Sequence, residues 1–239
     1  MGLFKGLRGI IPACDLKDGD KVLALVKATA SLDFIHGYKL GTAPSLANGL
    51  PAMMSTIRKY TDLPVIYDHQ KFGTDVPDVC SGELIEVFVE AKVNAVIIFP
   101  QAGPETLKAA VNALFQARIV PIVGGEMTHP RYLEGEGGYL SDKAPMRIYT
   151  DAAKLGVEYF VVPGTRPESI EKYKKELSKL SAQPKFLFPG IGKGQGGDIA
   201  EAFRRASPYP SWAIVGRGIY GEIDHRASAQ RLWTAVEQL

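Results

Sequence analysis

The sequence predicts an α/β protein, a single-domain (β/α)8 TIM barrel. Eight short apolar runs alternate along its 239 residues with longer segments in which apolar residues recur three or four positions apart. The short runs are almost continuously hydrophobic, as expected for parallel strands buried on both faces, and the longer segments have the period of amphipathic helices. Eight units of about thirty residues favour a closed barrel over the alternative, an open doubly wound sheet. No linker or compositional break interrupts the chain, so we expect one domain over residues 1–239.

The predicted strands and helices follow one another in strict alternation. The strands are GIIPACD (9–15), FIHGYKLG (34–41), PVIYDHQ (64–70), AVIIFP (95–100), IVPIVGGEM (119–127), YFVVPG (159–164), KFLFPG (185–190) and WAIVGRG (212–218). The helical segments are 20–30, 48–60, 82–93, 103–117, 148–156, 166–179, 198–206 and 225–239. Pro-Glu pairs at Pro104 and Pro167 indicate first helical turns. The irregular stretch 131–145 predicts a glycine-rich loop after the fifth strand, at the barrel end where active sites are built.

Composition excludes several classes of protein. The 28 Lys and Arg nearly balance the 26 Asp and Glu, and no basic block occurs, so we expect no nucleic-acid partner. No apolar run reaches the roughly 18 residues of a membrane span, and the start MGLFKGLRG lacks the apolar core of a signal peptide. The two cysteines, Cys14 and Cys80, are far apart and match no metal-binding spacing. These features predict a cytoplasmic protein with reduced thiols and no membrane contact.

Charged side chains end three successive buried strands. Asp15 ends the first, Lys39 lies near the end of the second, and Asp68 and Lys71 follow the third. A single Asp at such a position is usually a helix N-cap, but three strand ends that meet in one barrel mouth would form a network of alternating charge. Networks of this kind perturb pKa values and are typical of active sites.

Two glycine-rich loops predict a phosphate site on the other side of the mouth. PGIGKGQGGD (189–198) follows the seventh strand and VGRGI (215–219) follows the eighth. These two loops commonly bind phosphate in (β/α)8 barrels, because their backbone N–H groups approach the anion closely. Pro189, Gly216 and Arg217 are therefore candidate substrate-binding residues, with Arg217 able to bind a dianion through two N–H groups.

No metal, cofactor or side-chain nucleophile is predicted. The four histidines lie on separate units and form no H-x-x-x-H or facial-triad pattern: His36, His69, His129 and His225. Lys39 and Lys71 already supply positive charge among the strand-end carboxylates. Cys14 is next to Asp15, whose charge would raise the thiol pKa and disfavour the thiolate.

These motifs together resemble the orotidine 5′-phosphate decarboxylases, especially their compact archaeal form. The likeness extends over nearly the whole chain and rests on the order of the motifs. They are ACD, YKLG, DHQKFGTDVP, EMTHP, VVPGTRPE, PGIGKGQGGD and VGRGIY. The resemblance implies a carboxy-lyase of pyrimidine biosynthesis that converts orotidine 5′-phosphate to uridine 5′-phosphate and CO₂ without a cofactor.

The resemblance also implies roles for individual residues. The Lys71 ammonium would stabilise a carbanion at C6 of the pyrimidine and then protonate it, with Asp68, Asp75 and Lys39 as the other catalytic residues. Thr128 would contact the amide edge of the base and Gln195 would bridge the base and the phosphate. Asp15 would bind the ribose hydroxyls. Asp75, with Val76, would reach into the site of a partner subunit, so that the active form is a homodimer with shared active sites.

The sequence departs from the family pattern at two places. The usual Asp-x-Lys-x-x-Asp becomes Asp68-His69-Gln70-Lys71-Phe72-Gly73-Thr74-Asp75, with one extra residue in each interval. Residues three apart on a strand do not share a face, so Asp68 and Lys71 converge only if the strand bulges or ends between them. If the strand neither bulges nor ends there, His69, two residues before Lys71, takes the place of the first aspartate of the motif. The loop GIGKGQGGD is also one residue longer than usual, and this added residue affects whether the Gln195 side chain can reach the substrate.

Two alternative functions stay open. One is a Mg²⁺-dependent sugar-phosphate decarboxylase or aldolase of the same superfamily, such as the ketogulonate-phosphate decarboxylases and hexulose-phosphate synthases. Those relatives typically have an acidic residue at the end of the second strand, where this chain has Lys39, which would repel a metal ion. The other is a barrel that binds a nucleotide without converting it.

Overall fold

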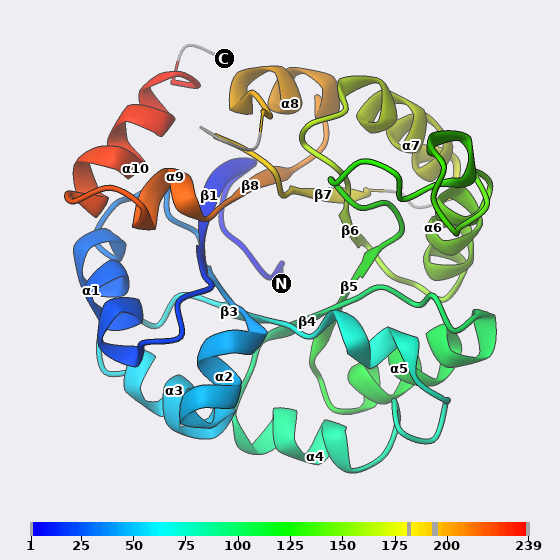
Figure 1. The fold of residues 1–239 in the computed structure, drawn as a ribbon, viewed down its shortest axis with the longest axis horizontal. Coiled ribbons are helices and arrows are strands. Elements are labelled where there is room, and N and C mark those ends of the chain that lie inside the picture. Colours follow the sequence, from blue (N-terminus) through cyan, green and yellow to red (C-terminus); the bar gives the residue numbers. More distant parts are fainter. Residues whose placement is uncertain (1, 181–182, 193–195, 238–239) are drawn as a thin grey trace.

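Eight parallel strands close into one barrel in chain order, with the last strand paired to the first. The computed structural model describes residues 2–180, 183–192 and 196–237, apart from the side chains of Gln70 and Lys71. Helices surround the barrel on all sides (Figure 1). The strands are β1 (Arg8–Cys14), β2 (Tyr38–Leu40), β3 (Val65–Asp68), β4 (Ala95–Ile98), β5 (Val120–Gly124), β6 (Tyr159–Val161), β7 (Lys185–Phe188) and β8 (Ser211–Val215). The predicted barrel is confirmed, and each strand lies within one residue of its predicted run.

A helix occurs in every segment for which the sequence predicted one. They are α1 (Gly19–Thr29), α3 (Leu50–Ile57), α4 (Glu83–Glu90), α5 (Pro104–Gln116), α6 (Ala144–Lys154), α7 (Pro167–Leu180), α8 (Ile199–Ala206) and α10 (His225–Thr234). Pro104 and Pro167 are first residues of their helices, as predicted. None of the described helices is long and apolar enough to cross a membrane.

The sequence did not predict four short elements. They are α2 (Thr42–Asn48), α9 (Arg217–Tyr220) and the 3₁₀ turns η1 (Gln70–Thr74) and η2 (Glu134–Glu136). Each is seven residues or shorter, too short to show a helical period. The loop predicted over 131–145 is also shorter than expected, because α6 already begins at Ala144.

Two hydrophobic layers separate the inside of the barrel from its outside. Side chains such as Ile11, Ile66, Ile97 and Ile214 fill the interior, whereas Tyr38, Leu40 and Tyr67 pack between the sheet and the helices. Successive side chains of a strand point to opposite faces, so inward positions recur every second residue. Continuing that alternation to the carboxyl ends of the strands leads to Asp15, Lys39 and Asp68.

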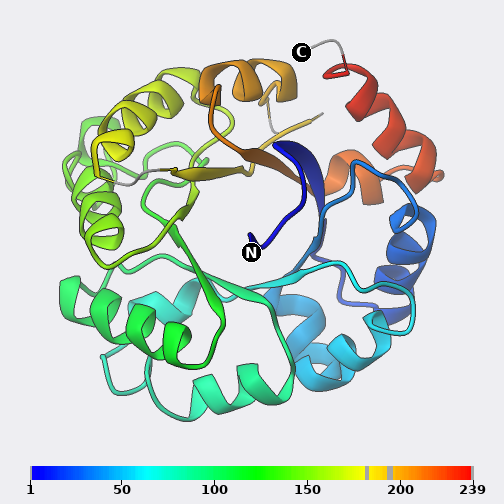
Figure 2. The same cartoon turned by 180° about the vertical axis from the view of Figure 1, so that it is seen from behind.

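The amino-terminal segment closes the opposite end of the barrel. Figure 2 shows this end, with the start of the chain inside the ring of strands. The Phe4 ring lies 4.7 Å from the Trp212 ring and 5.9 Å from the Tyr159 ring, centroid to centroid. The Trp212 indole donates to His36 Nδ1 at 3.0 Å, so this nitrogen is unprotonated. Burial lowers the pKa of His36, whose ordinary value is 6.5.

His36 makes the stability of the fold sensitive to acid. As the pH falls through 6.5 the unfolded chain takes up a proton at His36 before the folded chain does, so the free energy of unfolding decreases. In His36→Asn the amide oxygen can accept from Trp212 but does not titrate. We expect urea unfolding between pH 8 and 5 to show a smaller loss of stability for His36→Asn than for the wild type. Parallel pH profiles of the two proteins would contradict this assignment.

Candidate active site

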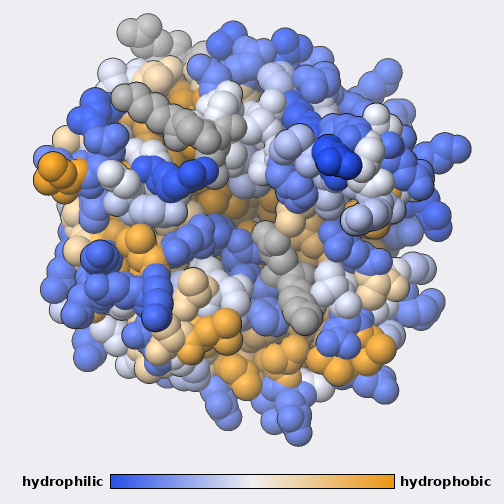
Figure 3. Space-filling model, viewed as in Figure 1, coloured by the Kyte–Doolittle hydropathy of each residue, from blue (hydrophilic) through white to orange (hydrophobic). Residues whose placement is uncertain are grey.

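A cavity of about 230 Å³ opens at the carboxyl ends of the strands. We call it the mouth cavity. Its floor consists of inward side chains that include Ala13, Ile97, Val161 and Ile214. Figure 3 shows this face of the molecule hollowed near its middle, with hydrophobic side chains at depth and hydrophilic ones around them. The residues predicted from sequence that line the cavity are Asp15, Lys39, Asp68, Thr128, Pro189, Gly216 and Arg217.

Lys39 holds the acidic side of the mouth cavity together. Its ammonium group lies 2.7 Å from Asp68 Oδ2 and 3.0 Å from Asp15 Oδ1. Only 10% of the Lys39 side chain is exposed to solvent, against 41% for Asp15. Burial by itself lowers the pKa of Lys39, but the charges and hydrogen bonds of Asp68 and Asp15 outweigh it and raise the pKa above its ordinary value. Lys39 is therefore a permanent cation with a fixed position.

One oxygen of Asp68 has no hydrogen-bond partner within the described residues. Its Oδ2 accepts from Lys39, whereas its Oδ1 is buried and has no hydrogen-bond partner in the part of the chain that the structure describes. A buried carboxylate oxygen without a partner is costly, so such atoms are usually completed by a ligand or a further side chain. Oδ1 is thus an acceptor at the wall of the mouth cavity.

The strand β3 ends between Asp68 and Lys71, where the sequence departs from the family spacing. The strand ends at Asp68, and the η1 turn begins two residues later, closed by a hydrogen bond of 2.9 Å from Phe72 N to His69 O. Asp68 therefore points inward, and Lys71 belongs to the 3₁₀ turn beyond the strand. The end of the strand between these two residues is one of the two arrangements that would allow them to converge. The Lys71 side chain and the whole of Gln195 lie outside the described residues, so their predicted roles stay predictions.

The alternative placement of His69 is wrong. Along β3 Ile66 points inward and Tyr67 outward, and the same alternation turns Asp68 inward and His69 outward. The His69 ring stacks on Tyr67 with centroids 5.2 Å apart and contacts Phe88 of α4. It therefore lies behind the sheet, where it cannot replace the aspartate.

Asp75 is not brought to the mouth cavity of its own chain. Its side chain is exposed at the end of η1, and Oδ1 accepts from the adjacent Val76 N at 2.8 Å. The next helix, α4, begins only at Glu83 and its N-cap is Gly82, so Asp75 does not cap the start of that helix.

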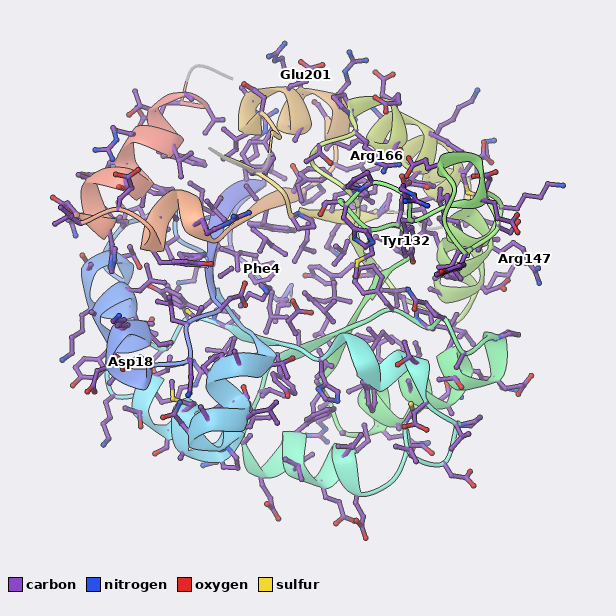
Figure 4. The ribbon with its side chains drawn as sticks, viewed as in Figure 1. Phe4, Asp18, Tyr132, Arg147, Arg166 and Glu201 are labelled. Carbon is purple, nitrogen blue, oxygen red and sulfur yellow. The ribbon has the colours of Figure 1, made fainter. Side chains whose placement is uncertain are left out.

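A buried polar network that the sequence did not predict supports the other side of the mouth. Glu126 is only 3% exposed, and it accepts from Arg166 Nη1 at 2.9 Å and from the Tyr173 hydroxyl. Arg166 also donates to Glu136 at 3.1 Å and to the His129 carbonyl at 3.4 Å. Burial raises the pKa of Tyr173, so its hydroxyl stays protonated and donates. In Figure 4 Arg166 lies beside the loop that carries Tyr132.

This network ties loop 131–145 to the barrel end. Thr128 and His129 line the mouth cavity immediately before that loop, and Arg166 links their segment to Glu136 within the loop. The Gln101 amide adds a second link at 2.9 Å to the Tyr132 hydroxyl. Arg166 lies within VVPGTRPE, one of the motifs on which the family resemblance rests, and the sequence offered no other signal for its role.

The two cysteines are buried thiols. Cys14 and Cys80 are both unpaired and buried. Burial, reinforced by the charge of Asp15, raises the pKa of the Cys14 thiol to about 12, in the predicted direction. Within the described residues, no three His, Cys, Asp or Glu side chains gather as a metal site.

Comparison with known proteins identifies the family. Residues 9–232 match the family described as orotidine 5′-phosphate decarboxylase / HUMPS. The chain belongs to this family. It is 31% identical over 227 residues to the orotidine 5′-phosphate decarboxylase of Pyrococcus abyssi, which covers 95% of this chain and 98% of that protein. The enzyme of the same name from Pyrococcus furiosus is 31% identical over 230 residues, or 96% of this chain and 98% of the relative.

The fold agrees with solved members of this family. A crystal structure of orotidine 5′-monophosphate decarboxylase from Methanocaldococcus jannaschii, complexed with the inhibitor BMP, superposes with a TM-score of 0.82. The two chains are 24% identical, and the match covers 97% of this chain and all of the other. At that identity the likeness establishes the shared barrel.

Removing the Lys39 cation is expected to destabilise the protein strongly. Lys39→Met would leave two neighbouring carboxylates without their counter-charge, one of them largely buried, at a cost of about 3 kcal/mol in the free energy of unfolding at pH 8. Urea unfolding measures the loss. Asp15→Asn is the control: because Asp15 is exposed, its loss should stay below about 1 kcal/mol. Equal losses for the two variants would argue against Lys39 as the centre of the network.

Proposed function

We propose that this chain is a cytoplasmic carboxy-lyase of pyrimidine biosynthesis that decarboxylates orotidine 5′-phosphate without a metal or cofactor, in a single barrel domain spanning the chain. The observation that carries the proposal is the mouth cavity. It combines a carboxylate–lysine–carboxylate network on β1–β3 with an arginine and glycine backbone after β7 and β8. The relatives of the same length that bear this activity in their names support it.

The acidic side of the cavity suits the chemistry of decarboxylation. When the bond between C6 of the pyrimidine and its carboxylate breaks, CO₂ departs and an electron pair stays on C6. The Lys71 ammonium, which the motif places one turn beyond Asp68, stabilises this pair and transfers a proton to C6 to give uridine 5′-phosphate. The Lys39 ammonium lies 2.7 Å from Asp68 Oδ2 and so holds Asp68 in place near the departing carboxylate, which sets the electrostatic field around C6 before substrate binds.

The opposite side suits the remainder of the nucleotide. Arg217 and Gly216 lie after β8, and Pro189 lies after β7, on the wall that would take the 5′-phosphate. Thr128, on the adjoining wall, offers its hydroxyl and backbone to the amide edge of the base, and the exposed Asp15 carboxylate accepts from the ribose hydroxyls. In this arrangement the apolar floor lies under the pyrimidine, which excludes water from C6.

Turnover of orotidine 5′-phosphate tests the proposal directly. Purified protein, with EDTA present, should remove the ultraviolet absorbance of the substrate. Lys71→Ala should reduce kcat by at least about 10³-fold, because it removes both the cation and the proton donor, while uridine 5′-phosphate still binds. A variant that kept a tenth of the wild-type kcat would contradict the role of Lys71. Wild-type inertness with tight product binding would favour a binding barrel, and Mg²⁺-dependent turnover of a ketose phosphate would favour the sugar-phosphate relatives.

We also propose that the active form is a homodimer in which Asp75 completes the partner's site. Asp75 is exposed at the end of η1 and does not line the cavity of its own chain. Several exposed apolar side chains follow it along the chain: Val76, Val79, Val87 and Val89. Figure 3 shows hydrophobic side chains gathered along this edge, over α4. A surface of this kind is typical of a protein interface.

Subunit exchange tests the shared site. Asp75→Asn and Lys71→Ala, each nearly inactive alone, should recover activity when mixed, because a mixed dimer has one site with both defects and one intact site. At full exchange half of the dimers are mixed, so about a quarter of all sites become active. Mass spectrometry of differently labelled subunits verifies the exchange. Verified exchange without recovered turnover would remove Asp75 from the partner's site.

A further inference from the structure

The two residues that flank Gln70 and Lys71 are held in one aromatic cluster. This cluster consists of Tyr67, His69, Phe72 and Phe88. The rings of His69 and Phe72 lie 6.2 and 5.3 Å from the Phe88 ring, centroid to centroid. Phe72 is 1% exposed, and its N–H donates to the His69 carbonyl, which closes the turn between them. The backbone is thus anchored immediately before Gln70 and immediately after Lys71.

His69 is also oriented within the aromatic cluster. Its ring is nearly parallel to that of Tyr67, with 21° between the planes, and its Nδ1 lies 3.1 Å from the Tyr67 hydroxyl. Tyr67 belongs to β3 and is 5% exposed, so the strand itself provides the surface on which His69 rests. The His69 side chain is therefore positioned from the sheet and from α4 together.

The far side of the η1 turn is packed against β4. A Cβ atom at Gly73 would lie 2.8 Å from the carbonyl carbon of Phe99, the residue that follows β4, so the turn is already in close contact with that backbone. Ala102 N donates to the Gly73 carbonyl at 3.4 Å, and the Thr106 hydroxyl donates to the Asp75 carbonyl at 2.8 Å. With one side blocked by β4, the place of the turn depends on the aromatic cluster at the other side.

We propose that His69 is a positioning residue, whose ring, held between Tyr67 and Phe88, fixes the 3₁₀ turn that presents Lys71 to the substrate. This inference rests on the proposed function for its effect on catalysis. The positioning role of His69 also accounts for the added residue between Asp68 and Lys71. A lysine carried by a turn lacks the support of a strand ladder, and the outward ring of His69 supplies an anchor in its place. Displacing a reacting group by about 1 Å costs on the order of 10²-fold in rate.

Three variants distinguish the effect of the His69 ring from the effect of its hydrogen bond with the Tyr67 hydroxyl. His69→Ala should lower kcat for orotidine 5′-phosphate by about 10- to 100-fold, with KM and the Kd of uridine 5′-phosphate within about twofold of wild type. His69→Phe keeps the ring and should restore kcat to within about threefold. Tyr67→Phe, which removes only the hydroxyl, should behave like His69→Phe. The matched control is Phe34→Ala, which removes a ring stacked on Trp233 at 5.1 Å, away from the mouth cavity, and should leave kcat unchanged.

Amide hydrogen exchange gives a second readout that needs no turnover. His69→Ala should speed exchange in the peptide covering residues 69–75 by about tenfold, and His69→Phe and Phe34→Ala should not. If the wild type fails to convert orotidine 5′-phosphate, the proposed function falls, and the exchange data alone decide whether His69 anchors the turn. A His69→Ala protein with wild-type kcat, or with wild-type exchange over 69–75, would overturn the inference. So would a loss of kcat that His69→Phe does not restore.

Discussion

The ion pairs of Lys39 with Asp15 and Asp68 are the interaction on which the mouth cavity depends. Three strands that are adjacent in the barrel each contribute one charge, and the cation is the most buried of the three groups. Transfer of an ammonium group from water into a protein interior is costly unless counter-charges surround it. The two carboxylates provide these counter-charges. The Lys39 ammonium in turn offsets the repulsion between the two carboxylates, which lie close together on one wall of the cavity.

Closure of the barrel converts this local network into a site. The inner layer fills the barrel below the charges, so a molecule in the mouth cavity meets apolar side chains beneath it and charged groups around it. Electrostatic interactions are stronger in such a setting because little water screens them. The same closure brings β8 beside β1, which places Arg217 on the wall next to Asp15.

The two sides of the mouth are stabilised in different ways. On the β3 side, the η1 turn is held by aromatic rings outside the barrel and by close backbone contact with β4. On the β5–β6 side, a buried carboxylate, Glu126, accepts from Arg166, which also binds loop 131–145 through Glu136. Both arrangements hold the backbone next to the cavity through contacts on the side away from the cavity. The residues that face the substrate are therefore oriented before the substrate binds.

The amino-acid sequence by itself determined the eight strand–helix units, because hydrophobic periodicity is a local property. It also indicated that Asp15 and Lys39 face one mouth, since inward positions alternate along each strand and parallel strands end on the same side, but it left the corresponding place on the third strand open between Asp68 and His69. The three-dimensional arrangement was needed to show that Asp68 points inward and His69 outward, that Asp75 does not line its own cavity, and that Arg166 contacts Glu126 and Glu136. Arg166 lies 40 residues from Glu126 along the chain. Contacts over such separations follow from how the closed barrel stacks its loops, and no local pattern of residues encodes them.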